Sequence, residues 1–244
     1  MKKIRWFIKD SLVYLTQRIL GRFPVSILMY HSVGDNSHFF TVRPKEFAKQ
    51  MHYLKSNNYN VLSLAHVVAD LNAGRPLPTH SVVLTFDDGY EDNFSNAYPI
   101  LKEYNFPATI FVSSGLIGVE RAVRGVSLHY LNKEQMLEMQ ASGLIDFQSH
   151  GMSHRNLTEL PEIESERELK ESKSFLESLF QKKINLFAYP FGASNAFIRE
   201  AVRGLFSGAV GVHYGYVNKK SSIFDLPRQS IDSKVTFRRF LLKI

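Results

Sequence analysis

The sequence of 244 residues contains no cysteine. Disulfide bonds and thiolate metal sites are therefore excluded, and any metal ion in this protein must have histidine and carboxylate ligands. The chain also has no internal repeat and no low-complexity tract, and its length suits one large α/β domain or two small ones. Hydrophobic residues make up 44% of it and charged residues 22%, which is ordinary for a globular protein with a buried core.

Little of the net charge of +7 belongs to the body of the chain. Residues 1–22 contain six lysines and arginines and one aspartate, so they account for +5 and leave +2 for the other 222 residues. The body has neither an interleaved basic and aromatic stripe nor a DNA- or RNA-binding motif. A nearly neutral body of this kind argues against nucleic acid as a partner.

The N-terminal segment lacks a long hydrophobic run, because its longest uncharged stretch covers only residues 11–17. A transmembrane helix needs about 20 mainly apolar residues, and a signal peptide needs an uninterrupted apolar region followed by a small-residue cleavage site. The segment has neither feature. We therefore expect a protein of the cytoplasm or of the membrane periphery rather than a secreted one.

Apolar residues do recur at helical spacing in this segment, namely at Ile4, Ile8, Leu12, Leu15 and Ile19. The spacing predicts an amphipathic helix over residues 1–22. Its basic residues, together with Trp6 and Phe7, fit a helix that lies on the surface of an anionic membrane. A helix that packs against its own domain fits the pattern equally well, so both interpretations stay open.

From residue 25 onward, apolar runs alternate with amphipathic stretches. The runs predict strands over residues 25–30, 61–64, 81–86, 108–112, 144–148, 185–189, 208–213 and 226–231. The stretches predict helices over residues 44–57, 65–71, 98–104, 133–141, 162–181, 195–203 and 237–244, and residues 113–131 are expected to form an irregular loop. Repeated alternation of this kind favours an α/β fold with a parallel sheet or a closed barrel.

Two adjacent carboxylates, Asp87 and Asp88, follow the strand predicted over residues 81–86, and Gly89 then permits a tight turn. By itself this stretch fits a simple Asp-Asp-Gly turn. Other strands, however, also end in chemically unusual residues, with His31, His150 and residues 190–192 at three of these ends. In a barrel these strand ends meet on one face, which makes a shared site there the stronger interpretation.

His150 and His154 are four residues apart, a spacing of one helical turn that can direct both imidazoles at one metal ion. Two ordinary surface histidines would show the same spacing. Combined with a carboxylate at a neighbouring strand end, the pair predicts a site with two histidines, one aspartate and open coordination positions. Such a set is typical of catalytic rather than structural metal sites.

The stretches 85–89 (TFDDG), 150–154 (HGMSH) and 188–192 (AYPFG), in this order, resemble the first three motifs of the polysaccharide deacetylases, the NodB-like carbohydrate esterase family four. The early stretch 28–32 (LMYHS) is similar to the branch that includes the poly-N-acetylglucosamine deacetylases. The resemblance covers roughly residues 25–232. It implies a distorted (β/α) barrel of about seven parallel strands, in one domain over residues 23–244 that follows the helix of residues 1–22.

The resemblance also implies a metal-dependent N-deacetylase with particular residues in its site. Asp88, His150 and His154 would bind the metal, which is usually Zn²⁺ in this family. Asp87 would be the general base and His31 the general acid, with His213 as the main alternative acid. The expected products are acetate and a free amino sugar.

The third motif is expected to contact the substrate through Tyr189, Pro190 and Phe191, and the backbone N–H of Phe191 would bind the oxyanion. This motif commonly begins with an arginine that braces the base, whereas Ala188 occupies that position here. We count Arg228 among the substrate-site residues as its candidate substitute. The alternative is an ordinary surface arginine after Pro227.

Two rival functions remain compatible with these motifs. The same residues could hydrolyse an acetyl ester of a polysaccharide, or the chain could be a catalytically silent glycan-binding module. We expect the substrate to be an N-acetylated glycan of the cell envelope, and residues 1–22 suggest a substrate near a membrane. Neither the sugar nor the oligomeric state follows from the sequence.

Overall fold

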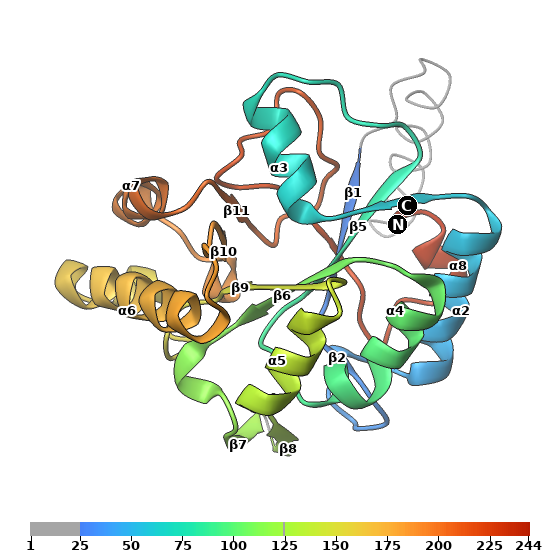
Figure 1. The fold of residues 1–244 in the computed structure, drawn as a ribbon, viewed down its shortest axis with the longest axis horizontal. Coiled ribbons are helices and arrows are strands. Elements are labelled where there is room, and N and C mark those ends of the chain that lie inside the picture. The colour runs from blue at the N-terminus through green and yellow to red at the C-terminus, as the bar shows by residue number, and fades with distance from the viewer. Residues whose placement is uncertain (1–24, 124) are drawn as a thin grey trace, which may run out of the picture.

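The computed structural model describes residues 25–123 and 125–244 (Figure 1). The helix predicted over residues 1–22 lies outside the described residues. Seven parallel strands form a curled sheet in the order β11-β10-β9-β6-β5-β1-β12, and an eighth, β4, pairs with the first half of β5. The strands are β1 (Ser26–Tyr30), β4 (Asn60–Leu62), β5 (Ser81–Phe86), β6 (Ala108–Val112), β9 (Ile145–Ser149), β10 (Leu186–Ala188), β11 (Gly208–Val210) and β12 (Gln229–Ser230).

The two ends of this sheet meet at one point, which we call the seam. Leu226, three residues before β12, forms a parallel bridge with Val210 of β11. Its N–H donates to the carbonyl of Ala209, and its own carbonyl accepts from the N–H of Gly211. A sheet path of seven strands with a seam of one bridge confirms the predicted distorted (β/α) barrel of about seven parallel strands.

The central strands are mainly apolar because both of their faces are covered. All six residues of β5 and all five of β1 are buried, as is typical of parallel strands in α/β proteins. Outward-facing residues such as Leu28, Leu84 and Phe86 belong to the main core under the helices. Ile27, Val83 and Val210 belong to a second core, which also takes in Leu64, Val67 and Val68 of helix α3.

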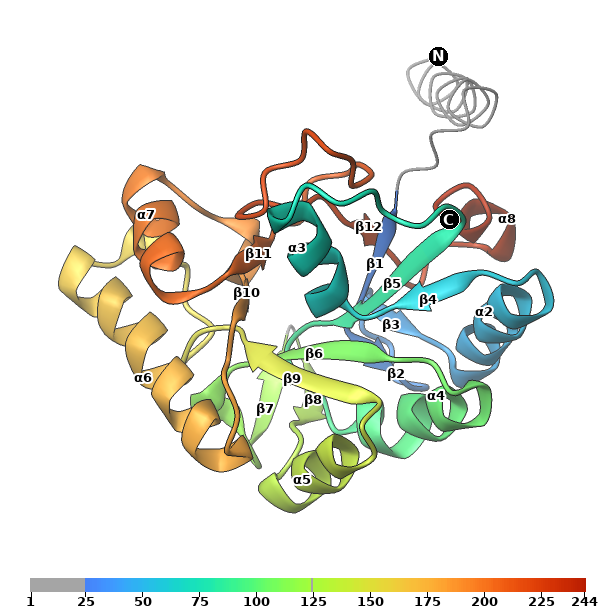
Figure 2. The ribbon, with the colours of Figure 1, turned by 45° about the horizontal axis from the view of Figure 1, so that its top comes forward.

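Helices surround the sheet, and Figure 2 shows α2, α4, α5 and α6 along its outer side. They are α2 (Pro44–Ser56), α3 (Leu64–Asn72), α4 (Tyr98–Tyr104), α5 (Lys133–Ala141), α6 (Glu162–Phe180), α7 (Ala196–Leu205) and α8 (Phe237–Phe240). Asn195 caps α7 by accepting a hydrogen bond from the N–H of Ile198, and Thr236 caps α8. Among these described helices, none is long and apolar enough to span a membrane.

The predicted loop of residues 113–131 is wrong in its central part. Strands β7 (Glu120–Val123) and β8 (Val126–His129) form an antiparallel hairpin there. Most residues of the hairpin are exposed, so its strands lack the apolar run that revealed the buried strands. A short parallel pair, β2 (Ser32–Val33) and β3 (Thr41–Val42), was also unexpected, and α8 ends four residues earlier than predicted.

Candidate active site

The residues singled out at the strand ends do lie together. A pocket of about 350 Å³ opens at the C-terminal ends of the strands. Its lining comprises His31, Phe39, Phe40, Asp87, Asp88, Tyr90, Arg121, Ala122, Val123, Tyr130, His150, His154, Tyr189, Phe191 and Val212. Seven of the ten residues predicted for the site therefore face one cavity, whereas Pro190, Arg228 and His213 do not line it.

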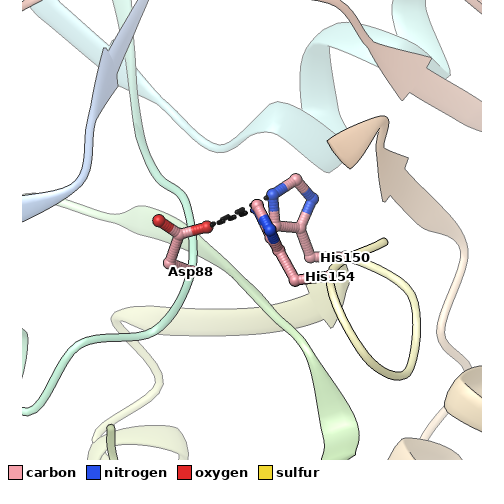
Figure 3. A group of neighbouring side chains, drawn as sticks. All are labelled: Asp88, His150 and His154. Carbon is pink, nitrogen blue, oxygen red and sulfur yellow. Dashed lines mark ion pairs between the residues drawn. The ribbon is translucent and has the colours of Figure 1, made fainter. Parts of the chain in front are cut away.

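Asp88, His150 and His154 form a compact group that could bind a metal ion (Figure 3). The Asp88 Oδ1 atom lies 3.0 Å from Nε2 of His154 and 3.5 Å from Nε2 of His150. One ligand atom from each residue falls within 4.8 Å of the other two. Asp88 and His150 are buried, and His154 is partly buried beside the pocket.

The hydrogen bonds of this group fit a cation. Nδ1 of His150 lies 2.7 Å from the carbonyl oxygen of Ala188 and must carry the ring proton, because a carbonyl oxygen only accepts. The lone pair on Nε2 of His150 then faces the carboxylate. Oδ1 of Asp88 is buried without a hydrogen-bond partner in the described structure. A buried orphan oxygen beside a free imidazole nitrogen is the arrangement that a divalent cation satisfies.

The backbone that presents the two histidines differs from the expected helical turn. Residues 150–156 are not helical, and the rings converge because Gly151 and His154 adopt left-handed φ angles of 78° and 55°. Helix α6 stabilises this loop through the buried carboxylate of Glu168. That carboxylate accepts hydrogen bonds from the N–H groups of Met152 (2.9 Å) and Ser153 (2.8 Å) and from the Ser153 hydroxyl.

Asp87 forms a buried two-pronged ion pair with Arg228. Nη1 donates to Oδ1 at 2.7 Å and Nη2 donates to Oδ2 at 2.6 Å, while Nε of the same arginine donates to the carbonyl of Gly211. Burial alone would raise the pKa of the Asp87 carboxyl, but the charge and hydrogen bonds of Arg228 outweigh it and lower the pKa below its ordinary value. Arg228 thus lies behind Asp87 and outside the pocket.

His31 follows β1 and faces the pocket from the side of Phe40, whose ring stacks on it at 4.8 Å. Its Nδ1 is buried without a hydrogen-bond partner in the described structure. Burial lowers the pKa of the imidazole, and the charges of Asp88 and Asp87 offset this only in part. The loop carrying His31 is fixed by Asn93, whose amide donates to the His31 carbonyl at 2.8 Å.

His213, the alternative acid, lies outside the pocket lining. Its side chain is half exposed and pairs with Asp225 at 3.4 Å. Geometry therefore favours His31 over His213 as the group that can reach a substrate in this pocket.

The third motif presents one exposed ring to the pocket. Phe191 is 64% exposed and has a φ angle of 59°, and its ring forms a T-shaped pair with the ring of His154, with centroids 4.7 Å apart. Tyr189 lines the pocket but is itself buried, and its hydroxyl donates to the carbonyl of Phe224. Pro190 is buried behind both. Of the four residues expected to contact substrate, Tyr189 and Phe191 are thus placed at the pocket surface.

Sequence reasoning missed several residues of the site. Phe40, Tyr90, Tyr130 and Arg121 line the pocket, and Glu168 supports the histidine loop. The hairpin residues gave no signal because they sit on short exposed strands. Glu168 belongs to a long charged helix, where a single inward-facing carboxylate does not stand out from its neighbours.

The structure is a (β/α) barrel with a candidate metal group, and its two histidines and two carboxylates lie at the C-terminal ends of the strands, where active sites of such barrels are found. The family model for polysaccharide deacetylases matches residues 74–205. The chain therefore belongs to the polysaccharide deacetylase family, as its motifs implied.

Individual relatives agree with the implied branch. The polysaccharide deacetylase homologue YxkH of Bacillus subtilis is 35% identical to this chain over 169 residues, which are 69% of this chain and 57% of YxkH. The poly-beta-1,6-N-acetyl-D-glucosamine N-deacetylase of Staphylococcus aureus is 29% identical over 203 residues, 80% of this chain and 69% of that protein. The structure of the Streptococcus pyogenes deacetylase PplD in complex with acetate is 30% identical, with a TM-score of 0.79, and the match covers 90% of this chain and 97% of PplD.

Proposed function

We propose that this protein is a metal-dependent hydrolase that removes N-acetyl groups from the amino sugars of a glycan and releases acetate. The observation that carries the proposal is the pairing of Asp87 with Arg228 directly beside the group formed by Asp88, His150 and His154. It supplies an ionised base next to a candidate metal site in one pocket. The names of the Staphylococcus aureus and Streptococcus pyogenes relatives support deacetylation as the reaction.

Asp88, His150 and His154 would bind the metal, and Zn²⁺ suits a set of two imidazoles and one carboxylate. When bound, such an ion polarises the acetyl carbonyl and lowers the pKa of water toward about 7. The carbonyl of Ala188 fixes the tautomer of His150, and the loop contacts of Glu168 set the position of His154.

Asp87 would accept the proton of the water that attacks the acetyl carbon. Arg228 supports this role because it keeps the carboxyl ionised and fixes both of its oxygens. The arginine directly precedes β12, the last strand of the barrel. It does not come from the third motif, where Ala188 packs in the second core. We therefore assign Arg228 to the base rather than to direct contact with the sugar.

His31 would give a proton to the nitrogen of the departing amino sugar, since an amide nitrogen leaves poorly unless it is protonated. Its place in the pocket lining supports the role, and its lowered pKa makes it ready to release a proton once it has been charged. The backbone N–H of Phe191 would donate to the oxyanion. The exposed ring of Phe191 would cover one face of the sugar.

We further propose that the substrate is an N-acetylated glycan of the cell envelope, with no nucleic acid as a partner. The basic, amphipathic pattern of residues 1–22 supports peripheral contact with a membrane and a place in the cytoplasm or at the membrane surface. Recovery of the full chain with anionic vesicles, compared with a chain that lacks residues 1–20, tests this. Equal recovery of both would contradict membrane contact through this segment.

The test of the activity is acetate release by the full chain, first stripped with a chelator and then reloaded with Zn²⁺, Co²⁺ or Ni²⁺. The substrates are N-acetylglucosamine oligomers and, as the matched ester control, O-acetylated xylan. We expect metal-dependent release from the N-acetylated oligomers. Release from xylan alone would convert the assignment to an O-acetyl esterase, and binding without release by the metal-loaded protein would leave a glycan-binding module.

A further inference from the structure

The hairpin of β7 and β8 places one arginine over the pocket. In its antiparallel register, Arg121 is opposite Leu128 and Glu120 is opposite His129. Side chains of opposed residues lie on the same face of a hairpin, and successive residues lie on opposite faces. Leu128 is buried against Tyr90 and Tyr130, so Arg121 lies on the face that is turned toward the pocket. Arg121 is accordingly one of the lining residues.

The acidic residue of the hairpin is on the other face and does not neutralise Arg121. Glu120 accepts a hydrogen bond from the Ser127 hydroxyl at 2.5 Å and lies 3.6 Å from His129. Across residues 25–123 and 125–244, no carboxylate forms an ion pair with Arg121. Burial and the charge of Asp88 raise the pKa of the Tyr130 hydroxyl, and the charge of Arg121 opposes this rise. Both residues line the pocket.

The other charges of the pocket are already matched. Asp87 is neutralised by Arg228, and Asp88 belongs to the candidate metal group. Arg121 is the one lysine or arginine among the lining residues of the described structure. Among the described lining residues, a substrate in this pocket therefore meets one exposed guanidinium, and no described carboxylate forms an ion pair with it. Elsewhere on the rim the exposed side chains are apolar, namely Phe39, Phe191 and Val212.

We propose that Arg121 forms an anion subsite and that the substrate is an anionic glycan, with a carboxylate or phosphate ester on the sugar next to the one that loses its acetyl group. This proposal rests on the proposed deacetylase function and names its substrate class. A guanidinium presents two parallel N–H donors that match the paired oxygens of a carboxylate or a phosphate. Phe191 and Phe39 offer apolar faces on which a sugar ring can stack.

Two matched substrate pairs test the subsite. The first is the disaccharide of N-acetylglucosamine and N-acetylmuramic acid, with its lactyl carboxylate free or converted to the carboxamide. The second is the N-acetylglucosamine disaccharide as its 1-phosphate or its methyl glycoside. We expect kcat/KM of the zinc-loaded protein to be about tenfold higher for the anionic member of one pair, and this preference to weaken as salt rises. The pair that shows the preference identifies the anionic group.

Arg121→Gln should abolish the preference by lowering kcat/KM for the anionic member and leaving it unchanged for the neutral one. Arg121→Lys should restore part of it, and Arg203→Gln, which removes a charge from the exposed side of α7, should leave it intact. An equal loss on both members, or no preference in the wild type, would overturn the subsite.

Equilibrium binding separates failure of the subsite from failure of the proposed function. The affinities of both members of each pair are measured by calorimetry in the Asp87→Asn background, with and without Arg121→Gln. Tighter binding of the anionic member that requires Arg121 supports the subsite even if the wild type releases no acetate, a result that would refute only the proposed activity. Equal affinities for both members would refute the subsite alone.

Discussion

Arg228 and Asp87 are 141 residues apart in the sequence, yet they form a pair of parallel hydrogen bonds of 2.7 and 2.6 Å inside the barrel. Their side chains are 0% and 3% exposed. Removing one partner of a buried pair leaves an uncompensated charge, whose cost exceeds that of losing a surface ion pair. The pair is therefore the most sensitive place in which to test both stability and chemistry.

Arg228→Met should destabilise the protein by about 3–5 kcal/mol in urea unfolding, because Asp87 would remain buried without a counter-charge. Arg228→Lys keeps the charge but loses the two-pronged geometry, so we expect kcat to fall by about tenfold to hundredfold with zinc content unchanged. The exposed-face control is Arg203→Lys. Wild-type kcat in Arg228→Met would show that the base does not depend on this arginine.

His31→Ala should lower kcat by about 10²–10⁴-fold while the protein still binds zinc, because only the proton for the leaving amine is lost. His213→Ala is the matched control, since His213 pairs with Asp225 outside the pocket, and its kcat should stay within about twofold of wild type. The measurements are kcat on an N-acetylglucosamine oligomer and metal content. A large loss of kcat in His213→Ala, with kcat of His31→Ala close to wild type, would assign the acid role to His213.

Glu168→Gln should weaken zinc affinity by about 10–100-fold without a comparable loss of folding stability. Three donors of the histidine loop use both carboxylate oxygens of Glu168 as acceptors. A glutamine side chain has only one acceptor oxygen, so at least one of these hydrogen bonds would be lost. Competition with a chromophoric chelator measures the affinity, and the absorption spectrum of the Co²⁺-loaded protein reports the ligand geometry. Glu171→Gln, on the exposed side of α6, is the control and should change neither. An unchanged affinity and spectrum in Glu168→Gln would contradict a positioning role.

Asp92 provides a prediction on pH and stability. Burial raises the pKa of its carboxyl to about 6, although hydrogen bonds from Ser32 and Val33 act in the opposite direction. A raised pKa means that the folded state binds the proton more tightly than the unfolded chain. The stabilising contribution is therefore present below about pH 4 and is lost as the pH rises through about 6.

Asp92→Asn should remove this dependence, because the amide keeps an acceptor for the N–H of Val33 and cannot ionise. Relative to wild type, we expect the variant to gain about 2 kcal/mol in unfolding free energy between about pH 4 and about pH 6.5. Asp35→Asn, at an exposed position of the loop after β2, is the control. If the unfolding free energy of Asp92→Asn depends on pH as that of the wild type does, the titration belongs to another group.

The buried parts of the fold could be predicted from the sequence because buried strands are rich in apolar residues. The strands β5 and β6 and the helix α5 have the predicted bounds, since the first two are unbroken apolar runs and Asn132 caps the third. The hairpin of β7 and β8 could not be found this way. Its strands are short and mostly exposed, so they contain no apolar run from which they could be predicted.

The parts of the site that lie within one sequence motif could be predicted, whereas contacts between distant segments could not. The spacing of His150 and His154 indicated a shared ion, but the helical turn assumed for it is replaced by a loop with left-handed residues. The partnership of Arg228 and Asp87 depends on the closure of the barrel. No local pattern encodes a contact across 141 residues, so Arg228 could be named only as a candidate.

The seam is a joint of a single β-bridge between Val210 and Leu226, and Arg228 follows Leu226 by two residues. Its guanidinium contacts Gly211 beyond β11 and both Thr85 and Asp87 at the end of β5, so it ties the two sides of the joint together. Local opening of the seam would release the arginine and raise the pKa of the Asp87 carboxyl. By reciprocity, protonation of Asp87 would loosen the joint. The ionised form of Asp87 and the closed seam thus stabilise each other. Because opening of the seam alone would remove the ionised base, inactivation on heating should precede global unfolding.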